Sequence, residues 1–142
     1  MKKRILCFIL TIAMLVGLTP TNIFSITAMA VAATAVTLTD NSGNQTVITA
    51  EDNTVGTGYT YDAETNTLTL NNWTGKKIQA NGDLNIHLKG TNTITMADSD
   101  PYGIKTDDKT ITVTSDDGAS LNVVGTGLTK YVYGIAANVV MP

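Results

Sequence analysis

The chain contains almost no cysteine, arginine or histidine. Cys7, Arg4 and His87 are the single residues of these types among 142. A disulfide needs two cysteines, so packing and backbone hydrogen bonds alone must hold a folded domain together. Zinc sites need several His, Cys or carboxylate ligands. His87 lies on the polar face of its segment without a partner His or Cys, which argues against a transition-metal site.

Long apolar runs are also missing, except at the N-terminus. Residues 2–4 are basic, residues 5–18 are apolar, and Ala-Met-Ala at 28–30 is a small-x-small cleavage site. A membrane-spanning helix needs about 20 apolar residues, whereas Thr, Gly and Pro interrupt this run. We therefore expect residues 1–30 to be a secretory signal peptide and the mature protein to be secreted or attached to the cell surface.

The mature chain expected from this cleavage is acidic and contains no arginine. Residues 31–142 carry six Lys against twelve Asp or Glu, a formal charge of −6. Nucleic acids and anionic membranes attract basic surfaces. We therefore expect no nucleic-acid partner, and no membrane partner once the signal peptide has been removed.

The residues that are abundant favour strands and turns. Residues 31–142 contain 21 Thr and 11 Asn; Thr suits exposed strand faces, and Asn and Gly suit turns. No window has helical periodicity, so we predict an all-β fold. Residues 36–38 and 46–48 are expected to pair around the turn at 40–43, and residues 59–61 are expected to pair with 67–70.

From about residue 65 the sequence repeats itself at intervals of 26 to 31 residues. Tyr-Gly-Ile occurs at 102–104 and again at 133–135, and Asn-Thr-Leu-Thr-Leu at 66–70 resembles Asn-Thr-Ile-Thr-Met at 92–96. Such periods are typical of solenoids, in which equivalent positions stack into apolar columns. The predicted columns are Leu68, Ile94 and Leu121; Leu70, Met96 and Val123; Ile78, Ile104 and Ile135; and Leu84 with Ile111 beside Ile86 with Val113.

These columns predict a parallel β-helix, which we expect to be right-handed; an immunoglobulin-type β-sandwich is the alternative. The two strands in NGDLNIHLKGTNTIT, residues 81–95, are then successive sides of one coil and not a hairpin. We divide the chain into the signal peptide at 1–30, an N-terminal hairpin cap at 31–75 and solenoid repeats at 76–142. The repeats end without a polar cap, so we expect further domains of a longer surface protein.

Two stretches carry a resemblance to a known group of proteins. Residues 58–73, GYTYDAETNTLTLNNW, and 78–94, IQANGDLNIHLKGTNTI, resemble the β-helical repeats of secreted and cell-surface proteins of Gram-positive, often clostridial, bacteria. Those proteins are commonly described as carbohydrate-binding-domain-containing. The resemblance implies non-catalytic binding of polysaccharide or cell-wall glycan, as in an adhesin, and it implies no catalytic residue.

Aromatic residues are the candidates for contact with sugar, because Tyr and Trp combine a flat apolar ring with a polar group. We select Trp73, Tyr102 and Tyr133. Trp73 has a second interpretation, as a plug in the core at the capped end. Tyr102 and Tyr133 recur at one repeat position, and such a ladder serves either to stabilise stacking or to bind sugar.

Acidic residues provide a weak calcium candidate: Asp98, Asp100, Asp107 and Asp108. Calcium takes six to eight oxygen ligands, but Asp is also a common turn residue that bonds to its own backbone. No cofactor is otherwise expected.

The sequence does not indicate an enzyme. Polysaccharide lyases share the parallel β-helix, but their chemistry uses a basic residue, often Arg, and residues 31–142 contain none. The adjacent pairs Asp107-Asp108 and Asp116-Asp117 diverge, whereas glycosidase carboxylates face each other. The alternatives to glycan binding are a structural stalk or spacer and an inactive or incomplete relative of the lyases.

Overall fold

The computed structural model describes residues 32–33, 35–99 and 101–141, and strands account for 68% of them. This confirms the predicted all-β class. The predicted signal peptide, residues 1–30, lies outside the described residues, and the part that is described contains no helix that could cross a bilayer. The strands are β1 Ala35–Asp40, β2 Gln45–Thr49, β3 Thr54–Gly56, β4 Tyr59–Asp62, β5 Thr67–Asn71, β6 Thr74–Ala80, β7 Leu84–Lys89, β8 Thr91–Met96, β9 Tyr102–Ser115, β10 Ser120–Gly125 and β11 Tyr133–Val140.

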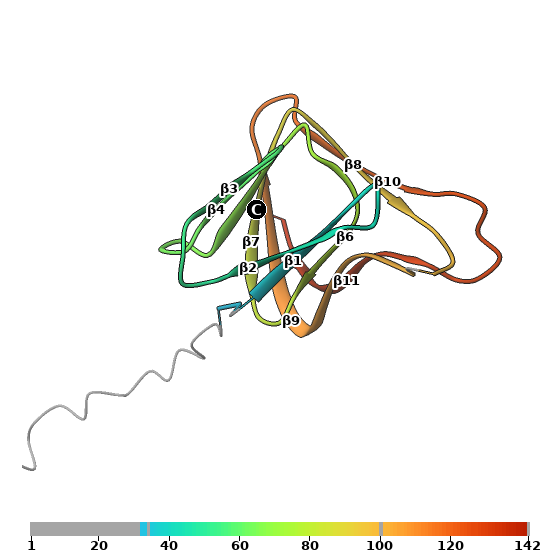
Figure 1. Ribbon diagram of the computed structural model, residues 1–142, viewed down its shortest axis with the longest axis horizontal. Coiled ribbons are helices and arrows are strands. Elements are labelled where there is room, and N and C mark those ends of the chain that lie inside the picture. The colour runs from blue at the N-terminus through green and yellow to red at the C-terminus, as the bar shows by residue number, and fades with distance from the viewer. Residues whose placement is uncertain (1–31, 34, 100, 142) are drawn as a thin grey trace, which may run out of the picture.

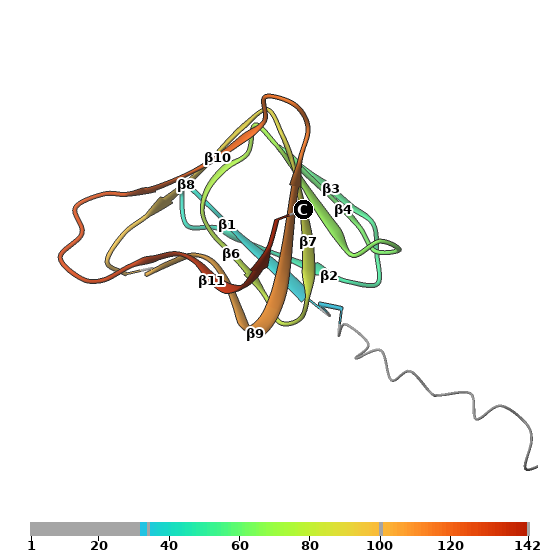
Figure 2. The same ribbon diagram turned by 180° about the vertical axis from the view of Figure 1, so that it is seen from behind.

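The strands form one mixed sheet that nearly closes into a barrel (Figure 1). Three sets of parallel strands stack within it. β5, β7 and the second half of β9 form the first set. The second set consists of β6, the first half of β9 and the start of β11. The third set consists of β6, β8 and β10. Figure 2 shows β10 beside β8 and β11 beside β9 from the opposite side.

The strands on either side of Lys89-Gly90-Thr91 take different partners, as predicted. β7 pairs with β5 and β9, whereas β8 pairs with β6 and β10. Gly90 has a φ of 62°, a left-handed conformation that glycine adopts without the cost of a Cβ. The chain therefore turns from one parallel set into the next at this point and does not fold back as a hairpin.

Two of the four predicted apolar columns are confirmed. Ile78 pairs with Ile104 and Ile104 with Ile135, and Leu84 pairs with Ile111 beside the pair of Ile86 and Val113. These matches come from different strands, so in these two columns residues about one sequence period apart lie side by side in the sheet.

The other two columns are wrong, the first members in their strand partner and the later members in register. Leu68 pairs with Ile86 rather than Ile94, and Ile94 pairs with Val123 rather than Leu121. The partners of the second column are also different: Leu70 pairs with Leu88, and Met96 pairs with Gly125. Alternation of apolar and polar residues has a period of two on every strand, so it does not reveal which parallel set a strand joins.

Antiparallel hairpins precede the parallel sets, as predicted. β1 pairs with β2 around the turn after Asp40, and β4 pairs with both β3 and β5. β1 also pairs with β6 in antiparallel orientation, so the first hairpin continues the sheet of the parallel strands. The division of the chain at residues 75 and 76 stays a prediction.

The core consists of inward residues from all three parallel sets and from the first hairpin, β1 and β2. The largest fully buried side chains are Val36, Ile48, Leu68, Leu70, Ile78, Leu84, Ile86, Asn92, Ile94, Ile104 and Ile111. Asn92 is the polar member of this group. Burial of aliphatic side chains contributes roughly 1.5–3 kcal/mol each, so this core stabilises the fold without a disulfide.

Candidate functional site

Tyr102 and Tyr133 stack on each other from neighbouring strands. β9 and β11 pair in parallel with Tyr102 opposite Tyr133, and the ring centroids lie 5.6 Å apart with an angle of 16° between the planes. The predicted aromatic ladder is therefore present. The side chain of Tyr133 is 55% exposed, so the pair presents aromatic surface to solvent.

A hollow of about 390 Å³ adjoins this aromatic pair. Its lining residues are Tyr102, Lys105, Thr106, Asp107, Asp108, Ala136, Ala137 and Asn138. β9 supplies the aromatic and charged groups, and β11 supplies two alanines whose small side chains leave the space open. An aromatic ring beside hydrogen-bonding groups is the combination that sugar recognition needs. We define these eight residues and Tyr133 as the tyrosine face.

Charges in the tyrosine face are arranged around Lys105. Its ammonium nitrogen lies 3.0 Å from Oδ1 of Asp107 and 5.3 Å from the centroid of the Tyr102 ring. The hydrogen bond with Asp107, followed by the charge of that carboxylate, raises the pKa of Lys105. Lys105 therefore stays protonated at neutral pH and acts as a cation that holds Asp107 and covers Tyr102.

Asp107 and Asp108 lie where β9 bends from one parallel set into another. Asp108 has a φ of 55°, a left-handed conformation that Asp and Asn adopt more readily than most residues. The bend is closed by the hydroxyl of Thr106, which donates to the carbonyl oxygen of Lys109 at 3.0 Å. The two carboxylates thus reach the hollow because the strand turns a corner there.

Trp73 belongs to the core and not to the tyrosine face. Its side chain is 5% exposed, and a Cβ placed on Gly75 would overlap the indole ring and lie 2.6 Å from the carbonyl oxygen of Thr39. Trp73 also lines a hollow of about 410 Å³ together with Tyr59 and other residues. At 5% exposure its ring offers little surface on which a sugar could stack, and this burial agrees with the plug interpretation.

Asp98 uses its carboxylate to join two loops. The backbone N–H of Thr129 donates to Oδ1 at 2.9 Å and to Oδ2 at 3.0 Å, and the N–H of Lys130 donates to Oδ1 at 3.2 Å. The hydroxyl of Thr129 donates to Oδ2 as well. These bonds connect the loop after β8 with the loop after β10, 31 residues further along the chain, so the carboxylate has a structural role other than the local turn bonding weighed against calcium.

The four predicted calcium ligands are not brought together among the described residues. Asp98 is occupied by Thr129 and Lys130, Asp107 and Asp108 lie at the bend of β9, and Asp100 lies outside the described residues. No group of three or more His, Cys, Asp or Glu able to hold a metal occurs in the described part of the chain.

The bonds to Asp98 predict an acid-sensitive contribution to stability. Hydrogen bonds first from the Thr129 hydroxyl and then from the Thr129 N–H lower the pKa of Asp98 below its ordinary value of 3.8. A lowered pKa stabilises the folded state above the unfolded pKa, and this contribution is lost as the pH falls through the folded pKa. We expect Asp98→Asn to melt at a lower temperature than the unaltered protein at neutral pH, because an amide nitrogen would face N–H and O–H donors.

Thermal melts from about pH 7 to about pH 2.5 would measure this effect. The difference in melting temperature between Asp98→Asn and the unaltered protein should shrink below about pH 3.8. Asp117→Asn, in the exposed turn after β9, is the matched control and should differ little at any pH. A difference that stays constant down to the lowest pH would contradict the assignment to the Asp98 carboxylate.

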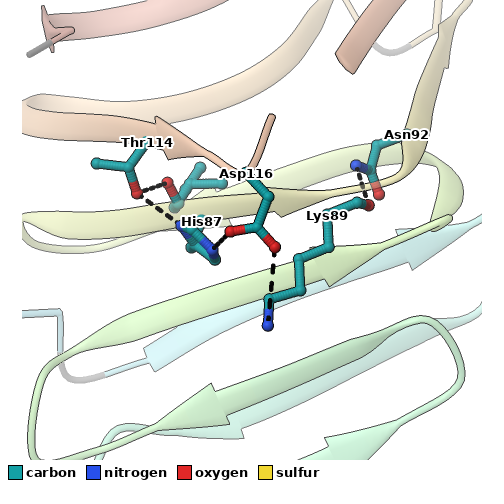
Figure 3. A network of polar contacts seen from close by, with 6 residues as sticks. His87, Lys89, Asn92, Thr114 and Asp116 are labelled. Carbon is teal, nitrogen blue, oxygen red and sulfur yellow. Dashed lines mark hydrogen bonds and ion pairs between the residues drawn. The ribbon is translucent and has the colours of Figure 1, made fainter. Parts of the chain in front are cut away.

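His87 takes part in a polar network on the outside of β7 and β9 (Figure 3). Its Nδ1 lies 2.9 Å from Oγ1 of Thr114, and its Nε2 lies 3.0 Å from Oδ1 of Asp116. The ammonium of Lys89 lies 4.0 Å from the other oxygen of Asp116. A hydroxyl, an imidazole and a carboxylate in line are also the groups of nucleophilic triads. Here, however, the strand register itself places His87 opposite Thr114, so the contact is that of ordinary cross-strand neighbours.

Comparison with protein-family models, with curated proteins and with solved structures finds no significant match for this chain. Function is therefore inferred from the geometry of the tyrosine face and from the sequence resemblance.

Sequence reasoning found part of this site and missed the rest. The repeated Tyr-Gly-Ile identified Tyr102 and Tyr133, but not the ion pair of Lys105 with Asp107 or the contribution of Asn138. The same repeat could have placed Lys105 in the site. Lys105 and Ala136 each follow the Ile of their tripeptide and pair with each other, so both lie beside the stacked tyrosines. The network at His87 and Asp116 also went unrecognised, because its members are 29 residues apart.

Proposed function

We propose that the chain is an exported cell-surface module that binds polysaccharide without catalysis, as an adhesin does, and that its parallel sets are the rungs of a right-handed β-helix. The observation that carries the binding function is the stacked pair of Tyr102 and Tyr133 beside a polar hollow. The resemblance to surface proteins of Gram-positive bacteria supports the same reading. A longer surface protein would present this module on the cell wall.

The β-helix is supported by the spacing of the paired strands. Ile78, Ile104 and Ile135 pair in succession, 26 and 31 residues apart. Between two members of this series the chain passes through strands of both other sets. A chain that visits three parallel sets in turn and returns in register is the pattern of a solenoid.

The proposal of a non-catalytic function is supported by the protonation state of Lys105. A lyase needs a base that can accept a proton at working pH. Asp107 raises the pKa of Lys105, so Lys105 holds its proton more firmly. The protonated ammonium cannot accept a second proton, and Lys105 is therefore unsuited to act as a base. An incomplete lyase relative would be detected by unsaturated products from uronate polymers, and we expect none.

Affinity electrophoresis of the purified protein through a panel of polysaccharides tests the proposal, with Tyr133→Ala as the diagnostic variant. Loss of a ring that stacks on sugar should weaken binding by about two- to tenfold, given about 0.5–1.5 kcal/mol for aromatic stacking contacts. Tyr131→Ala is the matched control, because Tyr131 is 95% exposed and lies outside the tyrosine face, whereas Tyr133 stacks on Tyr102. Equal retardation of both variants would contradict a role for the tyrosine face.

A structural stalk is the second candidate, and the pairing of the last strands favours it. β10 pairs with β8 and β11 pairs with β9, each along one edge within the described residues, so further rungs could be added in the same direction. A stalk predicts no saturable retardation by any polysaccharide although circular dichroism shows a folded β-protein. Retardation by one class of polymer would instead establish the binding module.

A further inference from the structure

The tyrosine face carries an excess of negative charge. Its charged members are Lys105, Asp107 and Asp108, which give one positive and two negative charges. Lys77 shares a second hollow with Asp107 and does not line this one. The balance of charge that a ligand meets in the hollow is therefore negative.

The excess of negative charge is larger at the solvent-exposed surface of the hollow, because the acidic side chain is more exposed than the basic one. The side chain of Lys105 is 32% exposed and that of Asp107 is 75% exposed. Lys105 is also engaged on two sides, by the carboxylate of Asp107 and by the ring of Tyr102. A ligand entering from solvent therefore meets carboxylate oxygens more readily than the ammonium group.

We infer that the tyrosine face takes glycans without acidic groups and that Asp108 excludes uronate polymers. This inference rests on the proposed glycan-binding function. Sugar hydroxyls donate hydrogen bonds, and an ionised carboxylate is a strong acceptor of them. Neutral sugars therefore gain binding energy from hydrogen bonds to Asp107 and Asp108. A uronate carboxylate in the same hollow meets like charge well within the Debye length of about 8 Å at physiological ionic strength.

Asp108 is the residue to vary, because Asp107 also holds Lys105. The left-handed φ of 55° at Asp108 is tolerated by Asn as well as by Asp. Asp108→Asn therefore removes one charge and keeps the bend of β9. Asp117→Asn is the matched control, since Asp117 lies in an exposed turn outside the hollow.

The experiment is affinity electrophoresis with two matched pairs of polymers, galactan with polygalacturonate and mannan with polymannuronate, at low and at physiological salt. We expect the unaltered protein to bind at least one neutral polymer and not its uronate counterpart. Asp108→Asn should strengthen uronate binding by about threefold or more at low salt and should weaken neutral binding, because an amide oxygen is a weaker acceptor than a carboxylate; Asp117→Asn should leave both unchanged.

The possible failures are distinguishable. Uronate binding by the unaltered protein as strong as neutral binding overturns the inference and leaves the binding function standing. An equal gain in Asp117→Asn overturns the role of Asp108, because net charge would then explain the selectivity. Binding of no polymer by a folded protein overturns the proposed function and this inference together.

Discussion

Replacing Asn92 by Ala is expected to lower the free energy of unfolding by about 3–4 kcal/mol. Asn92 is fully buried, and its side chain serves three backbone groups. Oδ1 accepts the N–H of Trp73 at 2.9 Å, and Nδ2 donates to the carbonyl oxygens of Lys89 at 3.1 Å and Ser120 at 3.3 Å (Figure 3 shows the bond to Lys89). A buried group left without its partner costs about 1–3 kcal/mol.

The position of Asn92 increases this effect because its bonds cross the stack of strands. Trp73 immediately precedes β6, Lys89 ends β7 and Ser120 begins β10. One side chain thus joins strands that precede and follow β8 in the stack. Asn92→Asp should also be destabilising, because a carboxylate cannot donate to the two carbonyl groups and would be an ion in the core.

Urea denaturation followed by circular dichroism measures the change at Asn92. Asn122→Ala is the matched control, since Asn122 is an exposed Asn on β10, the next strand of the same set. We expect Asn122→Ala to lie within about 0.5 kcal/mol of the unaltered protein. If Asn92→Ala unfolds at the same urea concentration as Asn122→Ala, the bridging role is wrong.

Replacing Trp73 by Ala is expected to cost about 3–5 kcal/mol, the range for removal of a large buried aromatic side chain. The ring of Trp73 packs against Gly75, which also lies close to the carbonyl oxygen of Thr39, at the place where β1 pairs with β6. Ala would leave a cavity between the N-terminal hairpin and the first parallel strands. With a shift of at least about 4 °C per kcal/mol for a domain of this size, the melting temperature should fall by about 12 °C or more.

Differential scanning calorimetry and affinity electrophoresis on the same variant separate the two roles of Trp73. A core plug predicts a large fall in melting temperature, with polysaccharide binding retained below that temperature. A sugar-stacking Trp predicts an unchanged melting temperature and lost binding, which would refute the core assignment. Tyr131→Ala is the exposed aromatic control and should melt like the unaltered protein, because Tyr131 is 95% exposed.

Gly75 provides an independent check of the same packing. Because a Cβ at Gly75 would meet both the indole ring and the Thr39 carbonyl oxygen, Gly75→Ala should destabilise by itself. Removal of the ring relieves one of these contacts, so the double variant with Trp73→Ala should lose less stability than the two single variants added together. Strict additivity would mean that the two residues do not touch.

The sequence by itself determined the class of fold and the positions of most strands. Alternation of apolar and polar residues marks a strand wherever it occurs, and Asn and Gly mark the turns between strands. The Tyr-Gly-Ile repeat also predicted the pairing of Ile104 with Ile135 and of Tyr102 with Tyr133, because equivalent positions of a repeat stack. These inferences need only local patterns and one long-range period.

Tertiary structure alone decided which strands become neighbours at the start of the stack and which polar groups meet. Leu68 pairs with Ile86 and not with Ile94, because a period of two is the same on every side of the molecule. Lys105 and Asp107 share one face of β9, but the bend at Asp108 decides that Asp107 and Asp108 line the same hollow. Asn92 is buried because its side chain replaces backbone partners that the strands around it lack. Such contacts depend on the three-dimensional path of the chain, and local residue preferences do not encode that path.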